Sequence, residues 1–148
     1  MADRSMPYWT IRHVEIREAV PGQTFTVFLL ENDGEDARYF DLQRMLAEPG
    51  PQEIDLELDS YCIVSESEGV DYGGLAEVTM LPGRLALHFR PEAVEELELP
   101  SEEISLGIDP GIDVHELWAG MQRVLTYGNH LKVPAMRFIR PSEGEAAL

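Results

Sequence analysis

The chain has 148 residues, of which 44% are hydrophobic and 26% are charged, a composition typical of a soluble globular protein. A chain of this length can build a hydrophobic core without a disulfide or a structural metal. Its 28 acidic and 11 basic residues leave a formal net charge of −17, which disfavours binding to nucleic acid or to an anionic membrane. The absence of a long apolar stretch and of a signal-like N-terminus predicts a cytoplasmic protein.

The first third of the sequence predicts extended structure. Tyr8–Ala19 alternates apolar and polar residues, and the alternation slips once near His13, which predicts a bulge or bend there. Thr24–Glu31 and Ala37–Leu46 flank the turn residues Asn32-Asp33-Gly34. This pattern predicts an antiparallel hairpin.

The next segment contains proline and glycine and is then acidic. Pro49, Gly50 and Pro51 predict a loop over Ala47–Gln52. In residues 53–59, apolar residues alternate with acids, which is compatible with either a short strand at a sheet edge or an irregular approach to the next strand.

Three further strands are predicted in the middle of the chain. Ser60–Ser65, Ala76–Leu81 and Arg84–Arg90 have strand patterns that together predict a meander. A polar turn at Glu66–Gly69 and the sequence Tyr72-Gly73-Gly74 separate the first two of these strands.

The last part of the sequence predicts two helices around one strand. Glu92–Leu99 predicts a two-turn helix, and Ile104–Ile108 predicts a strand. A longer helix is expected to begin after Asp113 as N-cap, with one apolar face running from Val114 to Leu125 and Gly128 as its C-cap.

These elements predict an α+β fold with a mostly antiparallel sheet of about 6–8 strands, one long C-terminal helix and one short helix. Residues 1–128 are expected to form a single domain. Residues 129–148 form a C-terminal extension with a basic and apolar character. The extension is compatible with a strand added to its own sheet or to a neighbour's, or with an arm lying across an acidic face.

The sequence contains no recognisable catalytic, metal-binding or cofactor-binding motif. Nucleophile-elbow and phosphate-loop patterns are missing, and the four histidines lack the spacing of metal ligands. The single cysteine, Cys62, lies within an apolar strand pattern and is interpreted as a buried structural thiol. Trp118 lies on the apolar helix face, where core packing is the favoured interpretation. We therefore expect no catalytic residue, no metal and no cofactor.

The acidic residues are concentrated in one part of the chain. Between Met45 and Gln122 there are 18 acids and only two bases, Arg84 and Arg90. Solubility alone is one explanation, and a face that attracts a basic partner is the other. The predicted partner-binding residues lie in an acidic turn and in a glutamate-rich helix: Glu66, Glu68, Asp71, Tyr72, Glu95, Glu96, Glu98 and Glu102.

The order and spacing of several segments resemble the bacterial immunity protein 10 family. These segments are Tyr39–Arg44, Leu58–Ile63, Tyr72-Gly73-Gly74, Leu85–Phe89 and the helix Val114–Leu125. The resemblance spans residues 14–127, and it implies a non-enzymatic protein that binds and neutralises the toxin domain of a polymorphic toxin system. It assigns no binding residue. The loop at residues 48–52 and the extension after Asn129 depart from the family pattern.

Two other functions remain open from the sequence. The chain could bind a small molecule, or act as an uncharacterised enzyme, in a pocket between sheet and helix with Trp118 or Trp9 at its wall. It could also form a homodimer through residues 129–148. The interpretation that combines charge and resemblance is an immunity protein whose acidic surface meets a basic surface of its cognate toxin.

Overall fold

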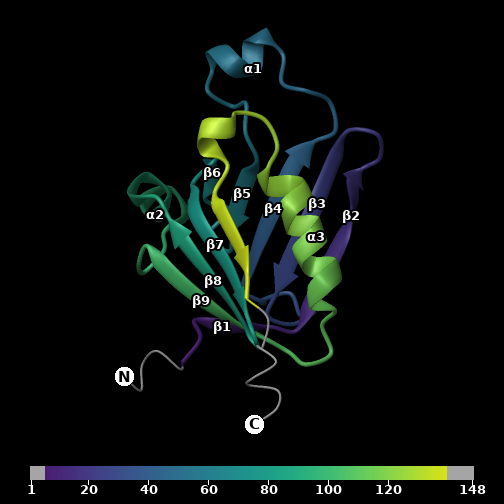
Figure 1. Ribbon diagram of the computed structural model, residues 1–148, viewed down its shortest axis with the longest axis vertical. Coiled ribbons are helices and arrows are strands. Elements are labelled where there is room, and N and C mark those ends of the chain that lie inside the picture. Colours follow the sequence, from purple (N-terminus) through teal and green to yellow (C-terminus); the bar gives the residue numbers. More distant parts are fainter. Residues whose placement is uncertain (1–5, 140–148) are drawn as a thin grey trace.

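The computed structural model describes residues 6–139 and has an α+β architecture with two five-stranded sheets (Figure 1). Sheet A has the strand order β1-β9-β8-β7-β10 and sheet B the order β2-β3-β4-β5-β6. The strands of sheet A are β1 (Trp9–Ile11), β7 (Leu75–Leu81), β8 (Arg84–Phe89), β9 (Glu103–Ile108) and β10 (Ala135–Phe138). Those of sheet B are β2 (His13–Val20), β3 (Thr24–Leu30), β4 (Tyr39–Met45), β5 (Cys62–Ser65) and β6 (Val70–Tyr72).

Three α-helices accompany the sheets in the described part of the chain. They are α1 (Pro51–Asp55), α2 (Pro91–Leu97) and α3 (Val114–Leu125), and a short 3-10 turn follows at His130–Lys132. The helix predicted after Asp113 is confirmed, because the Asp113 carboxylate accepts hydrogen bonds from the backbone N–H groups of His115 and Glu116. This helix has 12 residues and is followed by β10, so it is not C-terminal.

The number of sheets and strands differs from the prediction of one sheet with 6–8 strands. The chain passes from one sheet to the other at two corners, which divides the strands between two sheets. At the first corner, β1 runs into β2 through Arg12, whose N–H donates to the Leu30 carbonyl in sheet B. Of the two predicted alternatives near His13, a bulge or a bend, the slip of alternation therefore marks a bend, at which the chain changes sheet.

The second corner lies at Gly73–Gly74, between β6 and β7. The Gly73 N–H donates to the Tyr61 carbonyl beside sheet B, and the Gly74 carbonyl accepts from Arg90 N–H beside sheet A. The predicted three-strand meander is therefore wrong as a single sheet, because its first strand lies in sheet B and the other two in sheet A. The predicted hairpin of β3 and β4 is confirmed, with Val27 opposite Leu42.

Three smaller predictions are also corrected. Residues 51–52 were expected to be loop, and residues 53–59 either a short strand or an irregular segment. Instead residues 51–55 form α1, and of the two alternatives the irregular segment is the one found after it. Two short helices, α1 and α2, replace the one predicted. Gly128 is not the C-cap of α3, which is Thr126; with φ of 80° it lies against the backbone of Asp59, where a Cβ would overlap the Asp59 carbonyl.

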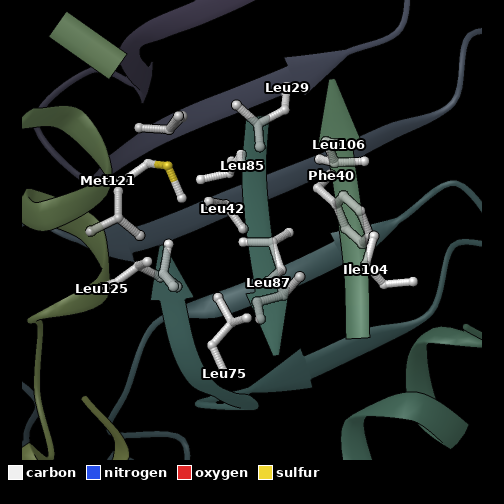
Figure 2. Close-up of a cluster of buried hydrophobic side chains, with 14 of the residues drawn as sticks. Leu29, Phe40, Leu42, Leu75, Leu85, Leu87, Ile104, Leu106, Met121 and Leu125 are labelled. Carbon is white, nitrogen blue, oxygen red and sulfur yellow. The ribbon is translucent and has the colours of Figure 1, made fainter. Parts of the chain in front are cut away.

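The hydrophobic core lies between the two sheets and α3. Figure 2 shows Leu29, Phe40 and Leu42 of sheet B facing five side chains of sheet A, with Met121 and Leu125 of α3 at one side. The five from sheet A are Leu75, Leu85, Leu87, Ile104 and Leu106. Gly120 lets α3 approach sheet B closely, since a Cβ there would lie 3.0 Å from Val27 Cγ2.

Part of the C-terminal extension belongs to the fold. Ala135–Phe138 forms β10, which pairs in parallel with β7 at the edge of sheet A. Of the alternatives left open by the sequence, the structure therefore shows a strand in the chain's own sheet. Residues 140–148 lie outside the described residues, and the homodimer through this extension remains a prediction.

Tyr61 connects the second corner to the end of the chain. Its side chain is fully buried, and its hydroxyl donates to the Lys132 carbonyl at 2.9 Å and accepts from the Leu75 N–H at 3.1 Å. Burial raises the pKa of this phenol above its ordinary value, so the hydroxyl keeps its proton as a donor. One side chain thus joins β5, β7 and the segment before β10.

Replacing Tyr61 with Phe should lower the free energy of unfolding by about 1–3 kcal/mol, because two buried backbone groups lose their partner. Urea denaturation measures this change. The comparison variant Tyr127→Phe removes a single hydroxyl contact, to the Ala47 carbonyl at 2.8 Å, and should cost less. Equal stability of Tyr61→Phe and the parent protein would contradict this role for the hydroxyl.

Candidate interaction surface

The structure brings together the two acidic segments selected from the sequence. The hydroxyls of Ser65 and Ser67 both donate to the Leu97 carbonyl at the end of α2, at 2.9 and 3.1 Å. Gly69 then lies directly against the α2 backbone, where a Cβ would overlap the Glu96 carbonyl oxygen. The turn between β5 and β6 is therefore attached to the C-terminal end of α2, and together they form one unit, the turn–α2 unit (residues 65–72 and 91–98).

Seven of the eight predicted residues belong to this unit. Glu66 and Glu68 are exposed in the turn, and Asp71 and Tyr72 follow on β6. Glu95, Glu96 and Glu98 are exposed on α2 or at its end. Glu102 is the exception, because its carboxylate lies 3.5 Å from His88 Nε2 on sheet A.

Two basic side chains near this unit, Arg38 and Arg90, are engaged by other groups, whereas Lys132 lines the same cavity as Asp71. Arg38 forms a two-pronged pair with Glu31, at 2.6 and 3.0 Å, and its charge only partly offsets the burial that raises the pKa of Glu66. On the other side of the unit, Arg90 Nε donates to the Gly73 carbonyl. Within residues 6–139, the exposed glutamates of α2 form no ion pair with Arg38 or Arg90, so their negative charge faces solvent.

Among the predicted binding residues of the unit, Asp71 is partly buried. Its Oδ2 has no hydrogen-bond partner in the described structure, and it occupies space that is free only because residue 74 is glycine. Burial raises the pKa of Asp71. The negative charges of Glu96 and Glu92 raise it further, whereas the positive charges of Lys132 and Arg90 lower it. The charged carboxylate is therefore less favourable in the folded chain than in water.

Replacing Asp71 with Asn should raise the melting temperature at pH 7. A carboxyl whose folded pKa is raised contributes stability below its unfolded pKa, about 3.9, and loses it as pH rises through the folded value. The melting temperature of the variant should therefore exceed that of the parent protein by more at pH 7 than at pH 3. Thermal unfolding of both proteins at the two pH values measures this difference in melting temperature. The same difference at pH 3 and pH 7 would contradict a raised pKa for Asp71.

Two cavities meet at Tyr72. One, of about 230 Å³, is lined by Asp71, Tyr72, Arg90, Glu92 and Lys132 among others. The second, of about 270 Å³, lies where the outer face of sheet B meets the loop that carries α1, and Tyr72 and Cys62 line it together with Glu53 and Leu58. Tyr72 thus connects the turn–α2 unit to the α1 region.

The sequence analysis did not select the residues of the α1 region as binding residues. Met45, Ile54, Leu56 and Leu58 are large apolar side chains that are between 37% and 58% exposed. Ile54, Leu56 and Leu58 alternate with acids in the sequence, and this pattern is compatible with either a strand or an irregular segment, so it did not identify them as contact residues. Exposed apolar residues that lie outside the core are candidates for contact with a partner.

The other candidate groups do not form a chemical site. Cys62 is partly rather than fully buried, and this burial raises its pKa to about 11, so it is a protonated thiol at neutral pH. Trp9 and Trp118 are core residues, and neither lines the two cavities beside α3. Residues 6–139 contain no group of three or more histidine, cysteine or acidic side chains placed to hold a metal ion.

The comparison with protein families identifies the chain's relatives. The model of the Immunity protein 10 family matches residues 10–114, which is 105 of the 148 residues. The chain belongs to the Immunity protein 10 family. No curated protein and no solved structure matches it.

The family match covers both acidic segments and the α1 region. It begins in β1 and ends at the first residue of α3, so it is shorter than the expected span of residues 14–127 at the C-terminal side. Immunity proteins are generally non-enzymatic, and membership implies a toxin as partner. Among residues 6–139, no helix has the length and apolar character needed to cross a membrane.

Proposed function

We propose that this chain is a non-enzymatic cytoplasmic immunity protein that binds and neutralises a cognate toxin domain of a polymorphic toxin system. Membership of the Immunity protein 10 family carries the proposal. The net charge of −17 supports a partner with a basic surface, because opposite fields accelerate encounter between two proteins.

The turn–α2 unit is the proposed site of electrostatic attraction. Its glutamates are exposed, and its two halves are attached through Ser65, Ser67 and Gly69. A rigid acidic surface loses little conformational entropy on binding, which favours affinity. Glu102 lies beside this surface, next to His88, and is proposed as a peripheral contact.

Co-expression with the neighbouring toxin gene of the source genome tests the function. Cells that produce the toxin alone should stop growing, and cells that also produce this chain should grow and yield a complex of the two proteins on purification. A toxin that remains lethal while this chain is abundant and folded would contradict the proposal.

Changing Glu95, Glu96 and Glu98 to Gln should slow association with the toxin by about tenfold at low salt and flatten its dependence on ionic strength. Dissociation should change less, because exposed charges act mainly on the encounter. Stopped-flow or surface-based kinetics at several salt concentrations measures both rates.

The matched control distributes the same loss of charge over the rest of the surface, as Glu18→Gln, Glu77→Gln and Glu116→Gln. These three residues are exposed and lie outside the turn–α2 unit. An equal slowing in both triple variants would show that only net charge matters, and it would contradict the assignment of the attraction to this unit.

A further inference from the structure

The loop around α1, residues 46–59, presents apolar side chains to solvent. Ile54 and Leu56 are 54% and 58% exposed, and neither belongs to the hydrophobic core. Leu58 of the same loop and Met45, the last residue of β4, are also exposed, and we call these four residues the apolar group. Figure 1 shows α1 at one end of the molecule, projecting beyond the strands of sheet B. Burying such side chains against a partner would be favourable by the hydrophobic effect.

The loop is held at both ends, so these side chains are presented in a fixed arrangement. The Tyr127 hydroxyl donates to the Ala47 carbonyl at 2.8 Å, and Asn129 N–H donates to the Asp59 carbonyl at 2.7 Å. Within the loop, the Glu53 carboxylate accepts from Gly50 N–H at 2.7 Å and fixes the start of α1. A preorganised loop reduces the entropic cost of binding.

A cavity of about 270 Å³ lies beside this apolar group. Leu58 from the loop and Met45, Cys62 and Tyr72 from sheet B provide apolar walls, while Glu53 contributes a carboxylate. Arg44 also lines the cavity, and its guanidinium donates to the Met45 and Leu46 carbonyls at 2.7 and 3.4 Å. The cavity is open to solvent and large enough for one long side chain. A lysine or arginine would place its aliphatic stem against Met45 and Leu58 and its charged end near Glu53.

The charges of the loop select the kind of occupant. Residues 46–59 contain five acids and no base: Glu48, Glu53, Asp55, Glu57 and Asp59. A second copy of this chain, itself at −17, and an anionic membrane would both be repelled. A basic protein surface with apolar positions between its charges fits both the acids and the exposed apolar side chains.

We propose that the α1 loop is the apolar anchor of the complex with the toxin, and that a basic side chain of the toxin enters the cavity between this loop and Tyr72. This inference rests on the proposed function and makes it more specific. The two surfaces are continuous, because Tyr72 lines both this cavity and the one beside α2. The turn–α2 unit accelerates the encounter, and the α1 loop slows dissociation.

The double variant Ile54→Ser with Leu56→Ser tests the anchor. Dissociation from the toxin should accelerate by at least about 30-fold, with little change in the association rate or its salt dependence, because apolar anchors at an interface act mainly on dissociation. The matched control is Met6→Ser with Ile139→Ser. These two side chains are 72% and 41% exposed and lie outside the loop, and their replacement should leave both rates unchanged.

The variant Glu53→Gln tests the cavity separately. The glutamine amide oxygen can still accept the hydrogen bond from Gly50 N–H. The first turn of α1 is therefore preserved, while the negative charge is lost. Dissociation should accelerate about tenfold, and thermal unfolding of the free protein should be nearly unchanged.

The outcomes separate this inference from the proposed function. In one outcome the parent protein binds and neutralises the toxin while the Ile54→Ser, Leu56→Ser variant dissociates at a rate within threefold of the parent rate. That result would contradict the role of the α1 loop as an anchor and leave the immunity function standing. If the parent protein itself neither binds nor protects against the toxin, the proposed function fails, and the anchor fails with it.

Discussion

The corner at Gly73–Gly74 is the constraint on which the rest of the structure depends. Here the backbone leaves sheet B and enters sheet A, with Gly73 at φ of 71°, and neither residue has room for a side chain against its neighbours. Tyr61 holds the strand beyond the corner through its hydroxyl. Because of this corner, β6 forms an edge of sheet B between α2 and the α1 loop. The same feature therefore closes the hydrophobic core and positions Asp71 and Tyr72 on the surface.

The charge distribution makes the electrostatic energy of the free protein less favourable than that of a complex with a basic partner. The exposed glutamates of α2 lie near other acids, and their mutual repulsion is unfavourable in the free protein. A basic partner converts this repulsion into attraction, and a partner that binds only the folded chain also stabilises it. In the proposed complex, charge and apolar contact have separate roles. Long-range charges would act on the rate of encounter, and the apolar side chains of the α1 loop would act on the lifetime of the complex.

Local sequence patterns predicted the local structure, but they could not predict contacts between segments that are distant in the sequence. Asp113 and the apolar face that follows it predicted α3, and Asn32-Asp33-Gly34 predicted the β3–β4 hairpin. The division into two sheets was missed because a change of sheet and a bulge leave the same slip in alternation. The acidic segments were found from composition, but their attachment through Ser65 and Ser67 depends on a contact 30–32 residues away along the chain. A loop was predicted over Ala47–Gln52, but helix α1 and the exposed apolar side chains beside it were not, because alternation with acids in residues 53–59 fits a strand as well as an irregular segment.

The central claim is that the toxin contacts a continuous surface formed by the α1 loop, β6 and α2. Amide hydrogen exchange of the free chain and of the purified complex tests it most directly, since it reports every backbone segment at once. The account predicts slower exchange on binding within residues 51–59, 66–72 and 92–98. Slower exchange confined to α3 and the outer face of sheet A, with these three segments unchanged, would contradict it.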